Sequence, residues 1–177
     1  MEKEDPRKAY NDFIEMHAEV FSPNEIGSLL LAGRPVGDKE RDSKEIENGL
    51  RRFFALWCLR EAYVKMTGEA LLAEWLQELG FARFPVPDPV QYEGGDDHDG
   101  GELGKPLVMG EEQGEGYEIY FKGERVRNVA IQIVAVGKKY MVASAVSRKD
   151  GKPVNVSWAK LDEVEIEEVV RRSKAAV

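Results

Sequence analysis

Hydrophobic residues recur with helical spacing over the first half of the chain and with an alternating spacing in part of the second half. Asp5 followed by Pro6 is typical of a helix start, and the apolar residues behind them predict a helix over residues 6–20. Residues 22–25 read S-P-N-E, a capping-box sequence, and predict a second helix that continues to Leu31.

The strongest helical pattern covers residues 43–68, and its centre, residues 53–59, is apolar on every face. A helix of this kind is buried on more than one side. Gly68 interrupts the pattern, and the apolar residues within 71–79 predict a further amphipathic helix that ends at Gly80.

The hydrophobic period changes from 3.6 to 2 after residue 116. Residues 117–122, 129–136 and 139–147 predict three strands joined at Gly123 and Gly137, in an antiparallel meander. Residues 161–174 predict a C-terminal helix. Helices followed by strands indicate an α+β fold in which helices pack on one face of a small antiparallel sheet, and the length suits a single domain over residues 1–177.

The net charge of −8 is concentrated in one glycine-rich segment, residues 92–116. This segment holds eight acidic residues against one base, Lys105, and eight of the 17 glycines, so the rest of the chain is close to neutral. Because the segment has little apolar area to offset its ordering entropy, we expect a mobile, disordered surface loop.

Composition also limits the partners and the compartment. An acidic chain is a poor candidate for binding nucleic acid over its whole surface, and no apolar run is long enough to span a bilayer, so we expect neither partner. The N-terminus is charged and has no apolar secretion-signal core, and the single cysteine, Cys58, suits a reducing compartment. We expect a cytoplasmic location.

Three charged residues, Arg60, Glu61 and Lys65, interrupt the apolar central helix. Glu61 and Lys65 follow Trp57 at intervals of four residues and therefore share a face. One interpretation is an ordinary surface ion pair worth a few tenths of a kcal/mol. The other is a binding site, since a carboxylate beside two cations could hold Mg²⁺ and a polyphosphate.

The same residues resemble a known family. Residues 57–65, W-C-L-R-E-A-Y-V-K, match the W-x-x-[KR]-E-[AS]-x-x-K signature of the 4′-phosphopantetheinyl transferases of the surfactin-synthetase type, and residues 51–79 look most like the fungal members. Residues 20–25 are similar to the family's F-[ST]-x-x-E segment, and residues 139–144 to its closing strand. The resemblance covers roughly residues 17–147.

The resemblance implies transfer of 4′-phosphopantetheine from coenzyme A to a serine of an acyl, peptidyl or aryl carrier protein. It implies that Glu61 is a Mg²⁺ ligand, and it leaves open a role for Glu61 in deprotonating the serine. Lys65 is implied to contact the coenzyme A phosphates and stabilise the leaving group. Arg60 is implied to bind coenzyme A, with a planar guanidinium suited to phosphate. Trp57 is expected to pack.

The sequence departs from the family in one respect. Members consist of two similar α+β halves, and a G-[IV]-D-x-E strand at their junction supplies further metal ligands. This chain has no such sequence, so it resembles the C-terminal half, and we expect weak or no activity from the chain alone. The alternatives are a non-catalytic module that binds coenzyme A or a carrier protein, and self-association through an exposed half-interface.

Two further residues could suggest chemistry, but we interpret both as structural. His17 lies on a predicted helix among aromatic residues and is expected to pack there. Cys58 lies within the apolar run and is expected to be a small core residue.

Overall fold

The computed structural model describes residues 5–31, 39–69, 73–90, 103–109 and 118–154. Three α-helices, two 3₁₀-helices and six strands lie in these ranges: α1 (Pro6–Met16), η1 (Ala18–Val20), α2 (Pro23–Leu29), α3 (Lys39–Thr67), η2 (Leu76–Glu78), β1 (Leu79–Ala82), β2 (Leu107–Met109), β3 (Glu118–Phe121), β4 (Glu124–Val126), β5 (Val129–Val136) and β6 (Tyr140–Ser147). The expected α+β class is confirmed. Within these ranges, every helix is too short or too polar to cross a membrane.

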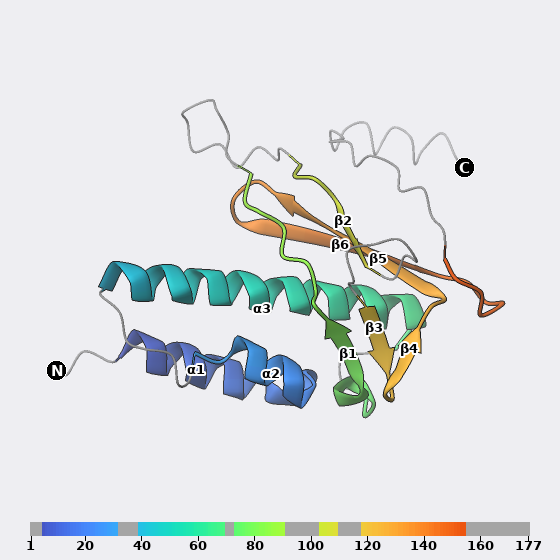
Figure 1. The fold of residues 1–177 in the computed structure, drawn as a ribbon, viewed down its shortest axis with the longest axis horizontal. Helices are drawn as coiled ribbons and strands as arrows, with labels where there is room; N and C mark the ends of the chain where they lie inside the picture. Colours follow the sequence, from blue (N-terminus) through green and yellow to red (C-terminus); the bar gives the residue numbers. More distant parts are fainter. Residues whose placement is uncertain (1–4, 32–38, 70–72, 91–102, 110–117, 155–177) are drawn as a thin grey trace, which may run out of the picture.

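Helix α3 lies at the centre of the molecule, with α1 and α2 on one side and the sheet that contains β5 and β6 on the other (Figure 1). This position accounts for its apolar centre, where Phe53, Leu56 and Leu59 are all buried. Phe54 is the exception, with 50% of its surface exposed. The prediction of burial on more than one side is therefore confirmed for the centre of the helix, except at Phe54.

Helices α1 and α2 begin where the sequence predicts. The Asp5 side chain caps α1 by accepting a hydrogen bond from the Arg7 N–H at 3.0 Å. The capping box at the start of α2 is present, with the Ser22 N–H donating to the Glu25 carboxylate at 2.8 Å. α1 is shorter than predicted and continues as η1, and α3 begins a turn earlier than residue 43.

The strands form two antiparallel sheets, so the predicted single meander is wrong. One sheet has the order β1-β3-β4, and the other has the order β2-β5-β6. Turns lie at Gly123 and Gly137 as predicted, and the second joins β5 to β6. The turn at Gly123, however, joins β3 to β4, a strand that was not predicted, and β4 and β5 are not paired. Alternation along a strand indicates which residues are buried but not which strand is its neighbour.

The predicted helix over residues 71–79 is also wrong where the structure describes it. Leu76 begins the short η2, and Leu79 begins β1, in which buried and partly buried residues alternate. The Arg60 guanidinium donates hydrogen bonds to the Leu76 and Leu79 carbonyls, and the Leu76 carbonyl also accepts one from the Leu79 N–H, which closes the 3₁₀ turn. The apolar residues whose spacing suggested a helix therefore lie in a short turn and a strand.

Two other predictions lie wholly or mostly outside the described residues. The C-terminal helix over 161–174 is outside them entirely. Of the acidic segment 92–116, only residues 103–109 are described, and there the expected loop contains a strand, since β2 pairs with β5.

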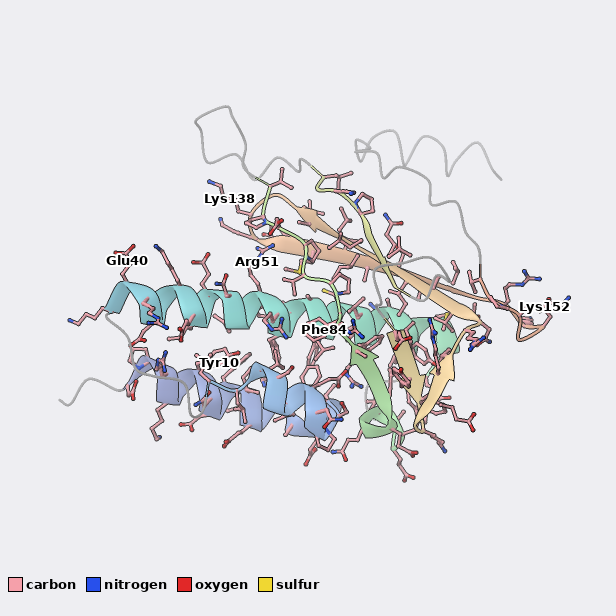
Figure 2. The ribbon with its side chains drawn as sticks, viewed as in Figure 1. Tyr10, Glu40, Arg51, Phe84, Lys138 and Lys152 are labelled. Carbon is pink, nitrogen blue, oxygen red and sulfur yellow. The ribbon has the colours of Figure 1, made fainter. Side chains whose placement is uncertain are left out.

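α1 approaches α3 closely at Gly49. Tyr10 lies between the two helices (Figure 2), and its hydroxyl donates to the Leu29 carbonyl at 2.9 Å. A Cβ atom on Gly49 would lie 2.5 Å from the Tyr10 hydroxyl oxygen, so this position requires glycine despite its low helix propensity.

We predict that Gly49→Ala destabilises the protein. The intrinsic helix propensity of alanine favours the change by about 1 kcal/mol, but overpacking against the buried Tyr10 ring costs about 1–3 kcal/mol. Urea unfolding monitored by circular dichroism measures the balance. The matched control is Gly27→Ala in α2, where a Cβ meets nothing within 4 Å, and which should stabilise by about 0.5–1 kcal/mol. Equal effects of both variants would contradict the close approach.

Candidate functional site

The structure places Arg60 and Glu61, neighbours in the sequence, in opposite environments. Arg60 points into the core and its side chain has no exposed surface. Glu61 lies on the outer face of α3, where 28% of its side chain is exposed. A step of one residue turns a helix by about 100°, which is enough to separate a core position from a surface position.

The Arg60 guanidinium is held by three acceptors and two aromatic rings. It forms an ion pair with Glu25 and donates to the carbonyl oxygens of Leu76 at 2.7 Å and Leu79 at 2.6 Å. Its central carbon lies 5.3 Å from the ring centroid of Phe21 and 5.7 Å from that of Phe81. Burial lowers the pKa of Arg60, and the neighbouring Glu25 carboxylate opposes that shift.

The Glu25 carboxylate is equally well satisfied. Besides the Arg60 pair, it accepts hydrogen bonds from the N–H and hydroxyl of Ser22, each at 2.8 Å, and from the N–H of Phe81 at 2.9 Å. Only 4% of the Glu25 surface is exposed. The carboxylate thus connects the start of α2, the middle of α3 and strand β1.

These contacts assign Arg60 a structural role and do not support the coenzyme A contact expected for it. A phosphate would have to displace Glu25 from an enclosed site, and the Glu25 charge would then be left buried without a partner. The sequence contained a signal for this arrangement, since Glu25 and Arg60 are charged residues in otherwise apolar segments, but it did not indicate that they pair.

Glu61 and Lys65 are brought together, as their spacing predicts. The Lys65 Nζ lies 3.6 Å from a Glu61 carboxylate oxygen, and 79% of the Lys65 side chain is exposed. An exposed pair of this kind contributes little to stability, about 0.3–0.5 kcal/mol. Lys65 is therefore free to move toward a ligand at small energetic cost.

Cys58 lies nearly one helical turn before Glu61. At Cys58, this face of α3 contacts the neighbouring sheet. Its sulfur lies 3.8 Å from the Met141 carbonyl oxygen on β6. Burial raises the pKa of the Cys58 thiol, the charge of Glu61 raises it further, and the charge of Lys65 lowers it. Cys58 is half-buried at the edge of the core, so its thiol senses both charges of the pair.

His17 and Trp57 pack as expected. The His17 ring lies 4.7 Å from the Phe13 ring and 5.8 Å from the Trp57 ring, measured between centroids. The His17 Nδ1 lies 2.8 Å from the Phe13 carbonyl oxygen. Both residues belong to an aromatic cluster between α1 and α3.

Few of the side chains that the structure describes are grouped in a way that could bind a metal ion. No group of three His, Cys, Asp or Glu side chains that could hold a metal ion occurs among the residues that the structure describes. Glu61 offers one partly exposed carboxylate, which fits the habit of Mg²⁺ of binding through one or two protein carboxylates and otherwise through water and substrate phosphate.

Comparison with known proteins agrees with the motif on α3. The model of the 4′-phosphopantetheinyl transferase superfamily matches residues 2–98, which include α1, α2, α3 and β1. The chain belongs to this superfamily. Three fungal relatives align with a larger share of the chain than this family model.

The three relatives are similar to most of this chain. The chain is 35% identical over 169 residues to 4′-phosphopantetheinyl transferase A of Aspergillus fumigatus, and 31% identical over 158 residues to 4′-phosphopantetheinyl transferase 1 of Fusarium mangiferae. These alignments cover 88% and 89% of this chain but 44% of each relative. It is 33% identical over 138 residues to 4′-phosphopantetheinyl transferase NpgA of Emericella nidulans, covering 78% of the chain and 37% of that protein. The chain thus spans less than half the length of these transferases.

We predict that Glu25→Gln destabilises this transferase-family fold by about 3 kcal/mol or more, because it leaves the Arg60 charge buried without a counter-charge. Urea unfolding measures the loss. The control is Lys44→Gln, which breaks the exposed ion pair with Glu40 and should cost less than about 0.5 kcal/mol. Similar unfolding midpoints for the two variants would mean that the Glu25–Arg60 pair contributes no more than a surface pair.

We predict that alkylation of Cys58 by neutral iodoacetamide reports the charges of Glu61 and Lys65. Glu61→Gln should lower the thiol pKa and speed the reaction by roughly twofold near pH 8, and Lys65→Gln should raise the pKa and slow it. The control is Glu47→Gln, on the same face of α3 but about 16 Å before Cys58, where salt screens the charge. An unchanged rate in both site variants would contradict the geometry.

Proposed function

We propose that this chain takes part in the Mg²⁺-dependent transfer of 4′-phosphopantetheine from coenzyme A to a serine of an acyl or peptidyl carrier protein. The observation that carries the proposal is the exposed Glu61–Lys65 pair, which occupies the last positions of the family motif on the open face of α3. The fungal transferases with which the chain aligns support the same reaction class.

In the proposed reaction the serine oxygen attacks the phosphorus atom that carries the pantetheine arm. A new serine oxygen–phosphorus bond forms, and the bond from that phosphorus to the bridging oxygen of the diphosphate breaks. The serine proton passes to a base, and 3′,5′-ADP leaves with the bridging oxygen. Negative charge develops on that oxygen, and a fixed cation nearby stabilises it.

Glu61 and Lys65 can take different roles in this reaction. The Glu61 carboxylate would provide one oxygen ligand for Mg²⁺, which when bound supplies positive charge next to the diphosphate. Lys65 is a long exposed cation on the same face, and its Nζ can leave Glu61 to contact the phosphate oxygens. Arg60 has no contact with substrate in this proposal and instead fixes the direction in which Glu61 points.

Further ligands would come from outside the described residues. β6 is the outer strand of its sheet among the strands described, and it lies next to Glu61 through the contact between Cys58 and Met141. A strand added along β6 would place its side chains beside this face of α3. Tyr140 and Val142 on β6 are 58% and 43% exposed, which also suits the proposed self-association with a second copy.

A second candidate is a non-catalytic module that binds coenzyme A or a carrier protein. The observation that favours it is that the described residues provide a single candidate carboxylate for the metal. Calorimetry distinguishes the two candidates. Mg²⁺-dependent binding of coenzyme A to the 177-residue chain favours the enzyme, and binding of a carrier protein without coenzyme A favours the module. For either candidate we propose a cytoplasmic location, because a single cysteine suits a reducing compartment.

The transfer reaction is tested in a chimera in which this chain replaces the matched segment of the Aspergillus fumigatus relative. With coenzyme A, Mg²⁺ and an apo carrier protein, we expect the carrier to gain the mass of one phosphopantetheine. Glu61→Gln and Lys65→Ala should each lower the rate by about 100-fold, because each removes charge stabilisation from the transition state.

The control for that experiment is Lys44→Gln, which changes the charge of an exposed residue in the first part of α3 and should leave the rate unchanged. A chimera that folds but never modifies the carrier would argue against the transfer. Full activity of the Glu61→Gln chimera would show that the proposed ligand has no role in it.

A further inference from the structure

A cavity of about 780 Å³ opens beside the buried Glu25–Arg60 pair, on the side of α3 away from Glu61. Its lining comes from α2, α3, η2, β1 and the β3–β4 hairpin. The α3 residue in the lining is Arg52, nine positions before Glu61, which places the two side chains about 180° apart around the helix axis. The cavity is thus separate from the proposed transfer site.

Two arginines in the lining have guanidinium groups that no acidic side chain binds. Within the described residues, neither the Arg52 nor the Arg83 side chain forms a hydrogen bond or an ion pair. Arg52 instead lies over the Phe84 ring, with 5.0 Å between its guanidinium carbon and the ring centroid. A guanidinium stacked on an aromatic ring keeps its N–H groups available at its edge, where they can bind carboxylate or phosphate.

The remaining charges in the lining are already paired. Glu25 is bound by Arg60, and Glu78 lies 3.9 Å from Lys122. Glu118 lies near enough to Arg83 for the two charges to interact, but it is already in an ion pair with Arg125 at 3.1 Å. The two glutamates of the lining are thus each paired with a base outside it, Arg60 or Lys122, which leaves the charges of Arg52 and Arg83 for a ligand.

The floor of the cavity is apolar and has room for a flat group. Phe81 and Phe84 line it and are buried, and Phe84 lies where β1 meets α3 (Figure 2). Gly80, in the middle of β1, faces open space, since a Cβ placed on it would meet nothing within 4 Å. The cavity has the size, apolar floor and few polar groups of a site for a small molecule.

Arg83 is held toward this space by its backbone. Its φ of +50° lies in the left-handed region, which is uncommon for a residue other than glycine, asparagine or aspartate. The residue directly follows β1, and the turn at Arg83 places the chain that leads to Phe84 against α3. This turn therefore places a cation beside the apolar floor.

We propose that this cavity binds a small organic anion that has an oxyanion head group and a flat or acyl apolar body. The head group binds Arg52 and Arg83, and the body lies along Gly80 and against Phe84. The inference does not depend on the transfer reaction, because neither Glu61 nor Lys65 lines the cavity.

The test uses three probes with one aromatic body and different charge: 2-naphthoate, 2-naphthalenemethanol and 2-naphthylmethylammonium. Each is titrated into the 177-residue chain by isothermal calorimetry. We expect 2-naphthoate to bind at least tenfold more tightly than the neutral probe, and the cation not to bind. Equal affinity for the anionic and neutral probes would overturn the assignment of the two arginines.

Two variants locate the site. Gly80→Val should abolish 2-naphthoate binding by filling the cavity, and it should not harm the fold, because valine suits a strand and a Cβ at this position meets nothing within 4 Å. Arg52→Gln, which removes the charge and shortens the side chain, should weaken binding by about tenfold. The matched control is Arg127→Gln, an exposed arginine outside the lining. Unchanged binding to Gly80→Val, with its unfolding midpoint preserved, would place the probe elsewhere and overturn the proposal.

Discussion

The buried ion pair between Glu25 and Arg60 is the contact on which the rest of the described fold depends. Neither charge can leave its partner without a large desolvation cost, and each also binds backbone groups. Through those groups the pair joins α2 and α3 to η2 and β1. Apolar contacts permit small slips, whereas a bound carboxylate and guanidinium fix one arrangement.

This constraint also determines what α3 presents to solvent. Because Arg60 must face Glu25, the rotation of α3 about its axis is fixed, and Glu61 and Lys65 are placed on the open face beside β6. Within the family motif, adjacent residues therefore have different tasks: the arginine orients the helix from inside the core, and the glutamate and the second cation face outward. In this chain the two cations of the motif therefore lie in different environments, Arg60 buried and Lys65 exposed.

The sequence predicts structural features that depend on residues close together in the chain. It does not predict features that depend on contacts between residues far apart in the chain. Asp5 and Ser22 correctly predict the starts of α1 and α2, and the glycines at the two hairpin turns are also correctly predicted. Both succeed because helix caps and turns are determined by a few neighbouring residues. The segment around Leu76 was mistaken for a helix, since its carbonyls are bound by Arg60 from another element. The division of the strands into two sheets and the depth of Arg60 depend on distant contacts in the same way.

The two faces of α3 are connected through one carboxylate. Glu25 lines the cavity that contains Arg52, and it also holds Arg60, the residue before Glu61. Because like charges repel, an anion in the cavity would depend on Arg52 and Arg83 to offset the charge of Glu25. The Glu25 carboxylate thus lies between the cavity and the residue that orients Glu61.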